Sequence, residues 1–176
     1  MTITNNKTID KILAIYKEVL KGDFQVYKNH VYRIYNYAIF FDDDKNNYEK
    51  YAIAAAFHDI GIWTHSFDYL EPSIQLASEY LIETGKNDWV NEVALLIDNH
   101  HRMSVYKGDF QHTVEIFRKA DWIDVIMGIK RFGLAKSTYK AIRKQISNKG
   151  FHWFLVKQSL NYFIKHPLNP LPMFKK

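Results

Sequence analysis

The sequence predicts an all-α fold in a single domain. Apolar residues recur at helical spacing along most of the 176 residues, and no stretch shows the strict alternation typical of a half-buried strand. The chain has only seven Gly and four Pro, so few residues interrupt the helices. Hydrophobic residues make up 47% of the chain, which is enough for a buried core. The length suits one domain, and no repeat or linker divides it.

Each expected helix ends at a glycine or a polar turn. Gly22, Gly61, Gly85 and Gly128 follow apolar-periodic stretches, and Pro72 suits the first turn of a helix. After the last helix, the three prolines of 167–173 predict an extended segment. These boundaries predict about seven or eight helices, near residues 10–20, 25–41, 48–60, 72–84, 88–101, 113–127, 135–148 and 151–166.

The composition excludes several classes of site. The chain contains no Cys, so disulfide frameworks, zinc ribbons, iron–sulfur clusters and thiol nucleophiles are ruled out, and a metal site must use His, Asp and Glu. The N-terminal segment lacks the pattern of a secretory signal, and the apolar run at 51–57 is too short to cross a membrane. We therefore expect a cytoplasmic protein without membrane segments.

Charge is distributed unevenly along the chain. Residues 1–129 carry 13 Lys and Arg and all 19 Asp and Glu, whereas residues 130–176 carry 11 Lys and Arg and no acidic residue. The basic part, which comprises the last two expected helices and the tail, favours a small anionic substrate. Nucleic-acid-binding signatures are missing, so we do not expect that partner, and the sequence leaves a homo-oligomer open.

Four polar residues fall on helix faces that should be buried. His30 lies on the apolar face of its helix, and His58 and Asp59 follow a run of alanines that lets helices approach closely. Asp121 lies within the apolar stripe of the sixth expected helix. An isolated buried carboxylate is costly, so it should be paired, hydrogen-bonded or bound to metal. Two imidazoles and two carboxylates form a donor set that suits a divalent cation and leaves room for water.

These residues resemble the HD superfamily, which is named for a metal-binding His-Asp pair. The matching segments are NHVYR around His30, AAFHDIG around His58 and Asp59, and RKADWID around Asp121, in the same order as in the family. The resemblance covers about residues 25–130. It implies that these four residues ligate a divalent metal, either Zn, Mn, Fe, Co or Ni, and a second metal remains open.

The resemblance also implies a metal-dependent hydrolase that uses a metal-activated water, most often on phosphate esters. Asp59 would orient that water, and a nucleotide or small phosphorylated metabolite would be the substrate. Arg33, Arg102 or Lys119 would hold phosphate oxygens, because cationic side chains, Arg above all, suit that role. Three positions after Asp121, Asp124 is expected to be a structural partner of a neighbouring Arg or Lys.

One departure concerns Ile62, which occupies a position that is acidic or basic in many relatives. Ile62 cannot transfer a proton, so the acid or base must come from elsewhere, and the candidates are His65, Asp68, His100 and His101. We expect at least one of His100 and His101 to reach the site, with His100 favoured. The predicted catalytic residues are Asp59, His100 and Arg33, and the predicted substrate-binding residues are Arg33, His65, His101, Arg102 and Lys119.

Three alternatives remain open at this point. An uncharged residue at position 62 and the SFDY segment also resemble the cyanamide hydratases of the superfamily, which act on a non-phosphate substrate. The superfamily also includes di-iron oxygenases, which need two additional His ligands, and the histidines at 65, 100 and 101 are candidates for that role. A ligand sensor that retains a metal without catalysis is the third.

Overall fold

A computed structural model of the protein describes residues 1–65, 68–153 and 156–157. The described chain is built from helices and turns and contains no strand, which confirms the all-α prediction. None of these helices is long and apolar enough to cross a membrane. The α-helices are Lys7–Ile15 (α1), Lys17–Leu20 (α2), Phe24–Phe41 (α3), Tyr48–Phe57 (α4), Gly61–Thr64 (α5), Leu70–Glu83 (α6), Val90–Asn99 (α7), Gln111–Val125 (α8) and Lys136–Gln145 (α9). Short 3₁₀ turns at Lys21–Asp23 (η1), Lys45–Asn47 (η2) and Asn87–Trp89 (η3) precede α3, α4 and α7.

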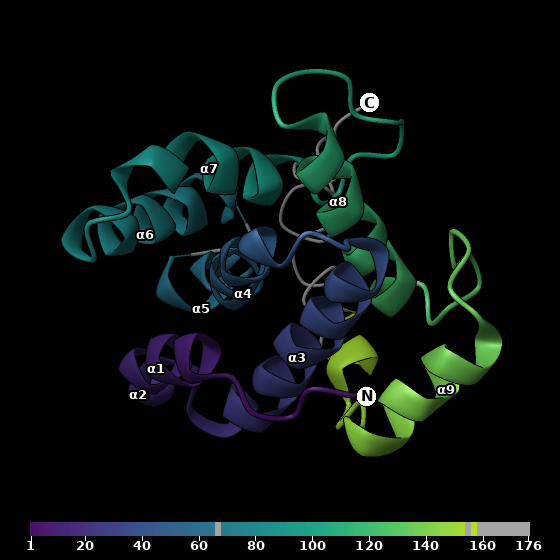
Figure 1. Cartoon of the computed structure of the whole chain (residues 1–176). Helices are drawn as coiled ribbons and strands as arrows, with labels where there is room; N and C mark the ends of the chain where they lie inside the picture. The colour runs from purple at the N-terminus through teal and green to yellow at the C-terminus, as the bar shows by residue number, and fades with distance from the viewer. Residues whose placement is uncertain (66–67, 154–155, 158–176) are drawn as a thin grey trace, which may run out of the picture.

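Helix α4 forms the centre of the fold, with α1, α3, α6 and α7 packed around it. Its residues 51–57 are fully or almost fully buried. A helix that is apolar on all sides is stable only when it is covered on all sides, and its alanines allow that close packing. Figure 1 shows α6 and α7 side by side on one flank, α1 and α2 on another, and α3 against α8. His58, directly after the C-terminal end of α4, lies beside His30 of α3 and Phe117 of α8.

Most helix boundaries agree with the sequence within a few residues, and two differ. The helix expected at 10–20 is interrupted at Tyr16, whose φ of −97° and ψ of 9° leave the helical region, so α1 and α2 are separate. The helix expected at 48–60 ends at Phe57, followed by a turn and then α5. Gly85 has φ of +72° and ends α6 as predicted. Within 151–166 the described residues 151–153 and 156–157 are helical, and the rest of that expected helix and the proline-rich segment lie outside the described residues.

Candidate metal centre

His30 projects from α3 into the interior and is completely buried. Its Nδ1 donates a hydrogen bond to Asp124 Oδ2 at 2.7 Å, and its Nε2 lies 3.1 Å from His58 Nε2. The ring of Phe151 stacks on the imidazole, with centroids 3.7 Å apart. These contacts on two sides fix the ring plane and direct Nε2 toward the end of α4.

His58 and Asp59 follow the last residue of α4, where the chain turns toward α5. His58 Nδ1 donates to the carbonyl of Ala55 at 2.8 Å, and His58 Nε2 lies 3.2 Å from Asp59 Oδ2. The hydroxyl of Tyr27 accepts a hydrogen bond from the Asp59 backbone N–H at 3.3 Å and donates to the carbonyl of Ala56 at 3.0 Å. The backbone of the doublet is thus held by α3.

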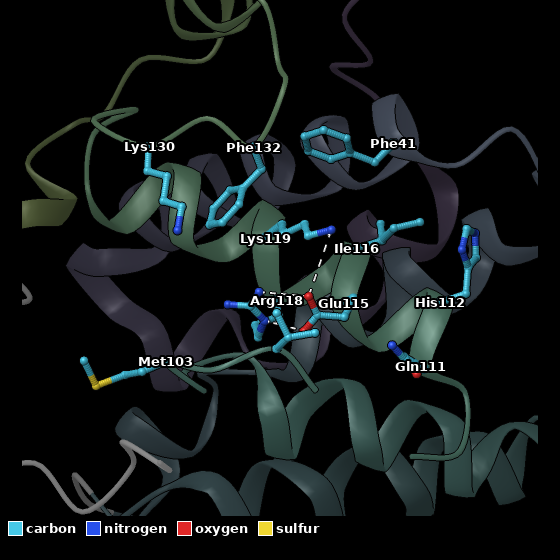
Figure 2. A pocket seen from close by; sticks show the side chains of 11 residues that line it. Phe41, Met103, Gln111, His112, Glu115, Ile116, Arg118, Lys119, Lys130 and Phe132 are labelled. Atoms are coloured by element: carbon cyan, nitrogen blue, oxygen red, sulfur yellow. Dashed lines mark hydrogen bonds and ion pairs between the residues drawn. The ribbon is translucent and has the colours of Figure 1, made fainter. Parts of the chain in front are cut away.

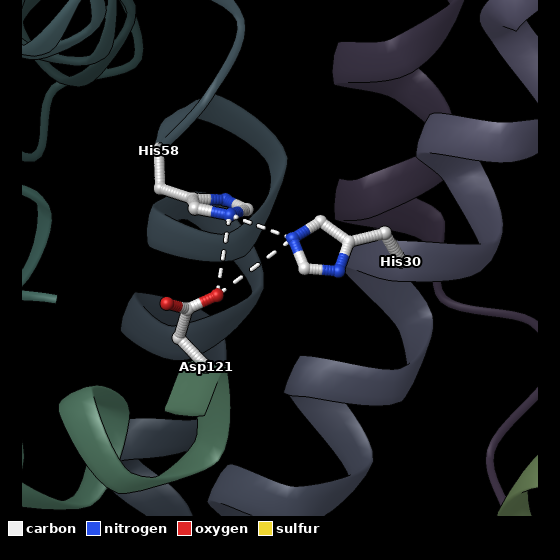
Figure 3. Close-up of side chains that lie close together, drawn as sticks. All are labelled: His30, His58 and Asp121. Carbon is white, nitrogen blue, oxygen red and sulfur yellow. Dashed lines mark hydrogen bonds and ion pairs between the residues drawn. The ribbon is translucent and has the colours of Figure 1, made fainter. Parts of the chain in front are cut away.

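Asp121 completes the arrangement from α8. Its Oδ1 lies 3.7 Å from His30 Nε2 and 3.9 Å from His58 Nε2. Figure 3 shows the three side chains converging from separate segments onto one point. The structure therefore brings together the four residues that the sequence singled out as metal ligands.

Two further histidines lie at the same centre, just after the end of α7. His100 Nε2 is 3.6 Å from Asp59 Oδ1, and its Nδ1 donates to the Ile97 carbonyl at 2.5 Å. His101 Nδ1 is 3.7 Å from Asp121 Oδ2, and its Nε2 shares a hydrogen bond with the Tyr69 hydroxyl at 2.6 Å. We call these six residues the His/Asp cluster: His30, His58, Asp59, His100, His101 and Asp121.

The hydrogen bonds at Nδ1 determine what the imidazoles present to the centre. A carbonyl or an ionised carboxylate can only accept, so His30, His58 and His100 each carry a proton on Nδ1. In their neutral form, all three direct an Nε2 lone pair inward. Lone pairs facing one another and two carboxylates repel unless a cation lies among them, and N–H groups bonded to carbonyl or carboxylate partners are typical of metal-ligating histidines.

The carboxylates fit the same interpretation. Asp59 Oδ1 and both oxygens of Asp121 are buried without a hydrogen-bond partner in the described part of the chain, and so is His100 Nε2. Buried polar atoms are normally paired, so these oxygen and nitrogen atoms without hydrogen-bond partners fit the coordination of a cation. Three groups within the cluster each bring their donor atoms within 4.8 Å of one another. They are His30, His58 and Asp121; His58, Asp59 and His100; and His100, His101 and Asp121.

The two central carboxyl groups differ in their electrostatic surroundings. Burial alone would raise the pKa of Asp59, but the imidazoles of His58, His100 and His30 hold it well below its usual value. Burial raises the pKa of Asp121 above its usual value, and the same imidazoles compensate only in part. The pKa values of the two carboxyl groups are thus shifted in opposite directions, and a cation bound among them would favour the ionised form of Asp121.

Arg33 lies elsewhere than the sequence led us to expect. It is completely buried, and its Nε and Nη2 donate to Asp124 at 2.6 and 2.7 Å. Its Nη1 donates to the Ser147 carbonyl at 3.0 Å. With these donors engaged, the guanidinium supports Asp124, and hence His30, rather than offering a clamp for phosphate. The expectation that Asp124 pairs with a neighbouring Arg agrees with these hydrogen bonds.

Lys119 also lies away from the cluster. It lies two positions before Asp121, which places the two side chains about 160° apart around the axis of α8. Its Nζ is 4.0 Å from Oε2 of Glu115, which lies one turn earlier on the same face of α8. His65 is exposed, with Nδ1 2.9 Å from Thr64 Oγ1. Arg102 follows His101 directly and donates from Nε to Ser104 Oγ at 3.1 Å.

Sequence reasoning missed Tyr69 and Phe151, which contact the cluster. Tyr69 directly precedes α6, and Phe151 lies far along the chain from the cluster residues, so helical periodicity alone could not place either side chain at the cluster. The interaction that joins Arg33, Asp124 and His30 did leave a signal in the sequence. Arg33 lies three positions after His30, and Asp124 lies three positions after Asp121, so each shares a helix face with a predicted ligand.

Comparison with known proteins agrees with this geometry. A sequence model described as "HD domain" matches residues 27–126, more than half of the chain. No curated protein and no solved structure shows significant similarity to the chain. The matched range contains His30, the His58–Asp59 doublet and Asp121, and family membership implies hydrolase-type chemistry that depends on a metal. The chain belongs to the HD domain family.

Proposed function

We propose that this protein is a metal-dependent phosphohydrolase that acts on a nucleotide or a small phosphorylated metabolite. The observation that carries the proposal is the convergence of His30, His58, Asp59 and Asp121, with carboxylate oxygens that lack partners among the described residues. The net charge of +5 and the acid-free stretch from residue 130 onward support an anionic substrate.

The proposed ligands are the four residues named in the sequence. A divalent cation, when bound, supplies a more acidic water and polarises an oxygen of the substrate. Asp59 is the residue that we propose to orient the attacking water, because its Oδ2 faces His58 and its Oδ1 faces His100. Asp124 and Arg33 are positioning residues for His30.

Substrate is proposed to enter beside His101. The His101 side chain is 13% exposed, whereas His30, His58, Asp59, His100 and Asp121 are 4% exposed or less. Arg102 is adjacent in the chain, and its guanidinium makes no ion pair with a carboxylate of the described residues. We therefore assign phosphate binding to Arg102 in place of Arg33 and Lys119.

In hydrolysis a water oxygen bonds to phosphorus, the bond from phosphorus to the leaving oxygen breaks, and protons must move at both oxygens. Ile62 cannot take part. Burial and the neighbouring imidazole of His100 hold the pKa of His101 well below its usual value, so its ring is neutral near pH 7. A neutral ring with one nitrogen on Tyr69 and the other toward Asp121 can pass a proton. We assign that role to His101 in place of His100, which the sequence favoured, because His100 is fully buried and its Nδ1 is engaged with the Ile97 carbonyl.

The test is a screen of nucleotides, sugar phosphates and generic phosphomonoesters with added Mn²⁺ or Ni²⁺. The proposal predicts release of inorganic phosphate by the wild type and by Asp88→Asn, an exposed control. Asp121→Ala should abolish both activity and metal binding while the protein remains folded. Metal binding by the wild type without phosphate release from any of these substrates would contradict the phosphohydrolase assignment.

A second candidate function is di-iron oxygenation, favoured by the presence of both His100 and His101 beside Asp121. It requires two irons per chain and consumption of O₂. A single redox-inert metal in the active protein would eliminate it.

Because position 62 is uncharged, the same screen should include nitriles and cyanamide, whose hydration would identify the hydratase alternative.

A further inference from the structure

A cavity of about 700 Å³ opens on the face of α8 that points away from the His/Asp cluster. Figure 2 shows Lys119, Lys130, Phe132 and Phe41 gathered around it, with Arg118 and Glu115 beside them. Lys119 and Ile116 lie more than 130° from Asp121 around the helix axis at about 100° per residue. None of the six cluster residues lines it. The cavity is therefore a second site, separate from the candidate metal centre.

The positive charge of Lys119 and Lys130 dominates this cavity, because the charge of Glu115, the acidic residue in its lining, is already neutralised. Glu115 accepts two hydrogen bonds from Arg118, at 2.6 and 2.9 Å, and one from the Tyr106 backbone N–H at 2.7 Å. Lys119 Nζ is a distant third partner at 4.0 Å. Arg118 and Glu115 thus cancel, and the ammonium groups of Lys119 and Lys130 remain as an excess positive charge at the wall of the cavity.

The apolar part of the wall includes two aromatic rings, those of Phe41 and Phe132. Lys130 Nζ lies 4.8 Å from the centroid of the Phe132 ring, and the Arg118 guanidinium carbon lies 5.8 Å from it. Phe132 adopts φ of +47°, a conformation that is strained for a bulky residue. Backbone strain of this kind is retained where the surrounding structure imposes it, and it concentrates at ligand sites.

We propose that this cavity binds a small organic anion with a flat aromatic body. The anionic group, a phosphate, sulfonate or carboxylate, is attracted by the positive charge of Lys119 and Lys130, and the aromatic body packs against the ring of Phe132. The volume falls within the range of small-molecule sites, and the wall combines apolar side chains with cationic groups that suit an organic anion. Binding here needs no metal, since none of the proposed metal ligands takes part.

The probe for this proposal is 1-anilinonaphthalene-8-sulfonate, whose fluorescence rises on binding, titrated into the full-length protein with a chelator present. Its uncharged analogue N-phenyl-1-naphthylamine serves as the comparison ligand. The double variant Lys119→Gln/Lys130→Gln should weaken sulfonate binding by about tenfold or more, because it removes both charge-assisted contacts. Binding of the uncharged analogue should remain within about twofold, because the aromatic wall is unchanged.

Lys140→Gln/Lys144→Gln is the matched control, since it removes two exposed lysines from α9 and the same amount of charge. This control should bind the sulfonate as the wild type does, and so should Asp121→Ala. Equal sulfonate affinity in the two double variants would overturn the proposal. Loss of binding in Asp121→Ala would place the dye in the His/Asp cluster and would overturn it as well. Thermal melting of each variant excludes unfolding as the cause of a change.

Discussion

His30 is oriented by Asp124, whose Oδ2 accepts a hydrogen bond from His30 Nδ1 at 2.7 Å in a fully buried environment. Arg33 donates to both oxygens of the same carboxylate. Burial alone would raise the pKa of Asp124, but Arg33 and His30 hold it well below its usual value, so the carboxylate stays ionised. The three residues form a fixed support for one proposed metal ligand.

Asp124→Asn should weaken metal binding while leaving the cluster residues in place. The amide accepts from His30 less strongly than the carboxylate, so the ring is less well oriented and less basic. Loss of such an outer contact costs about 10- to 100-fold in metal affinity. Competition with a fluorescent chelator, on protein reconstituted with Zn²⁺, measures the change, with Asp88→Asn as control. Equal affinity in the two variants would show that Asp124 is structural only.

Arg33→Met should destabilise the fold and leave substrate binding unaffected. Removing the guanidinium leaves the Asp124 carboxylate buried with His30 as its main partner, and breaking a buried ion pair costs about 3–5 kcal/mol. Adding Asp124→Asn should recover part of that loss, because the unpaired charge is then gone. Urea denaturation of the single and double variants tests this. A raised KM with unchanged stability would instead restore the predicted role of Arg33 as a phosphate clamp.

Gly61, the second residue after Asp59, should not tolerate a side chain. A Cβ there would lie 2.5 Å from the Tyr69 carbonyl and 2.9 Å from Ser73 Oγ, so α5 and α6 would have to separate. Gly61→Ala should cost about 1–3 kcal/mol of unfolding free energy through overpacking. Gly22→Ala is the matched control, because no atom lies within 4 Å of its added Cβ. Similar melting temperatures for the two variants would contradict the close approach of α5 and α6.

Asp42 links the end of α3 to α4 and should make stability depend on pH. Burial alone would raise its pKa, but hydrogen bonds from the Tyr51 hydroxyl, the Asp44 N–H and the Asn47 amide lower it below its usual value. A carboxyl with a lowered pKa stabilises the fold fully above its unfolded pKa, about 3.9, and that stability is lost as pH falls through the folded value.

Asp42→Asn should therefore cost about 1–3 kcal/mol at pH 7, and the difference from the wild type should shrink as pH falls from about 5 to 3. Urea denaturation at several pH values follows both proteins. A difference that stays constant across this range would mean that ionisation of Asp42 does not contribute to stability.

The sequence predicted the arrangement around His30, His58, Asp59 and Asp121 because each combines a polar side chain with a buried helix face. Helical periodicity reports which face points inward, and the His-Asp doublet beside an alanine-rich helix adds a specific pattern. Periodicity does not report the partner of a side chain. Arg33 shares the inward face of His30, so it became a buried partner of Asp124 instead of a residue that contacts substrate.

Helix interruptions and contacts between distant segments were harder to predict, because both depend on tertiary packing. No proline or glycine marks the break at Tyr16, where tertiary packing sets the backbone and the ring meets Phe57 edge to face at 5.9 Å. Tyr69 and His101 come from segments outside regular helices, and their contact at 2.6 Å joins positions 32 residues apart. Such contacts depend on the folded chain and leave no local pattern in the sequence.

Metal stoichiometry tests the central claim most directly. Protein stripped with a chelator should be reconstituted separately with Zn²⁺, Mn²⁺, Co²⁺, Ni²⁺ and Fe²⁺, and metal per chain should be measured by elemental analysis. We predict about one or two cations per chain for the wild type and for Asp88→Asn, and loss of binding in His58→Ala and Asp121→Ala. Wild-type protein that retains none of these metals, or an Asp121→Ala variant that binds them equally well, would contradict the assignment of the His/Asp cluster as a metal centre.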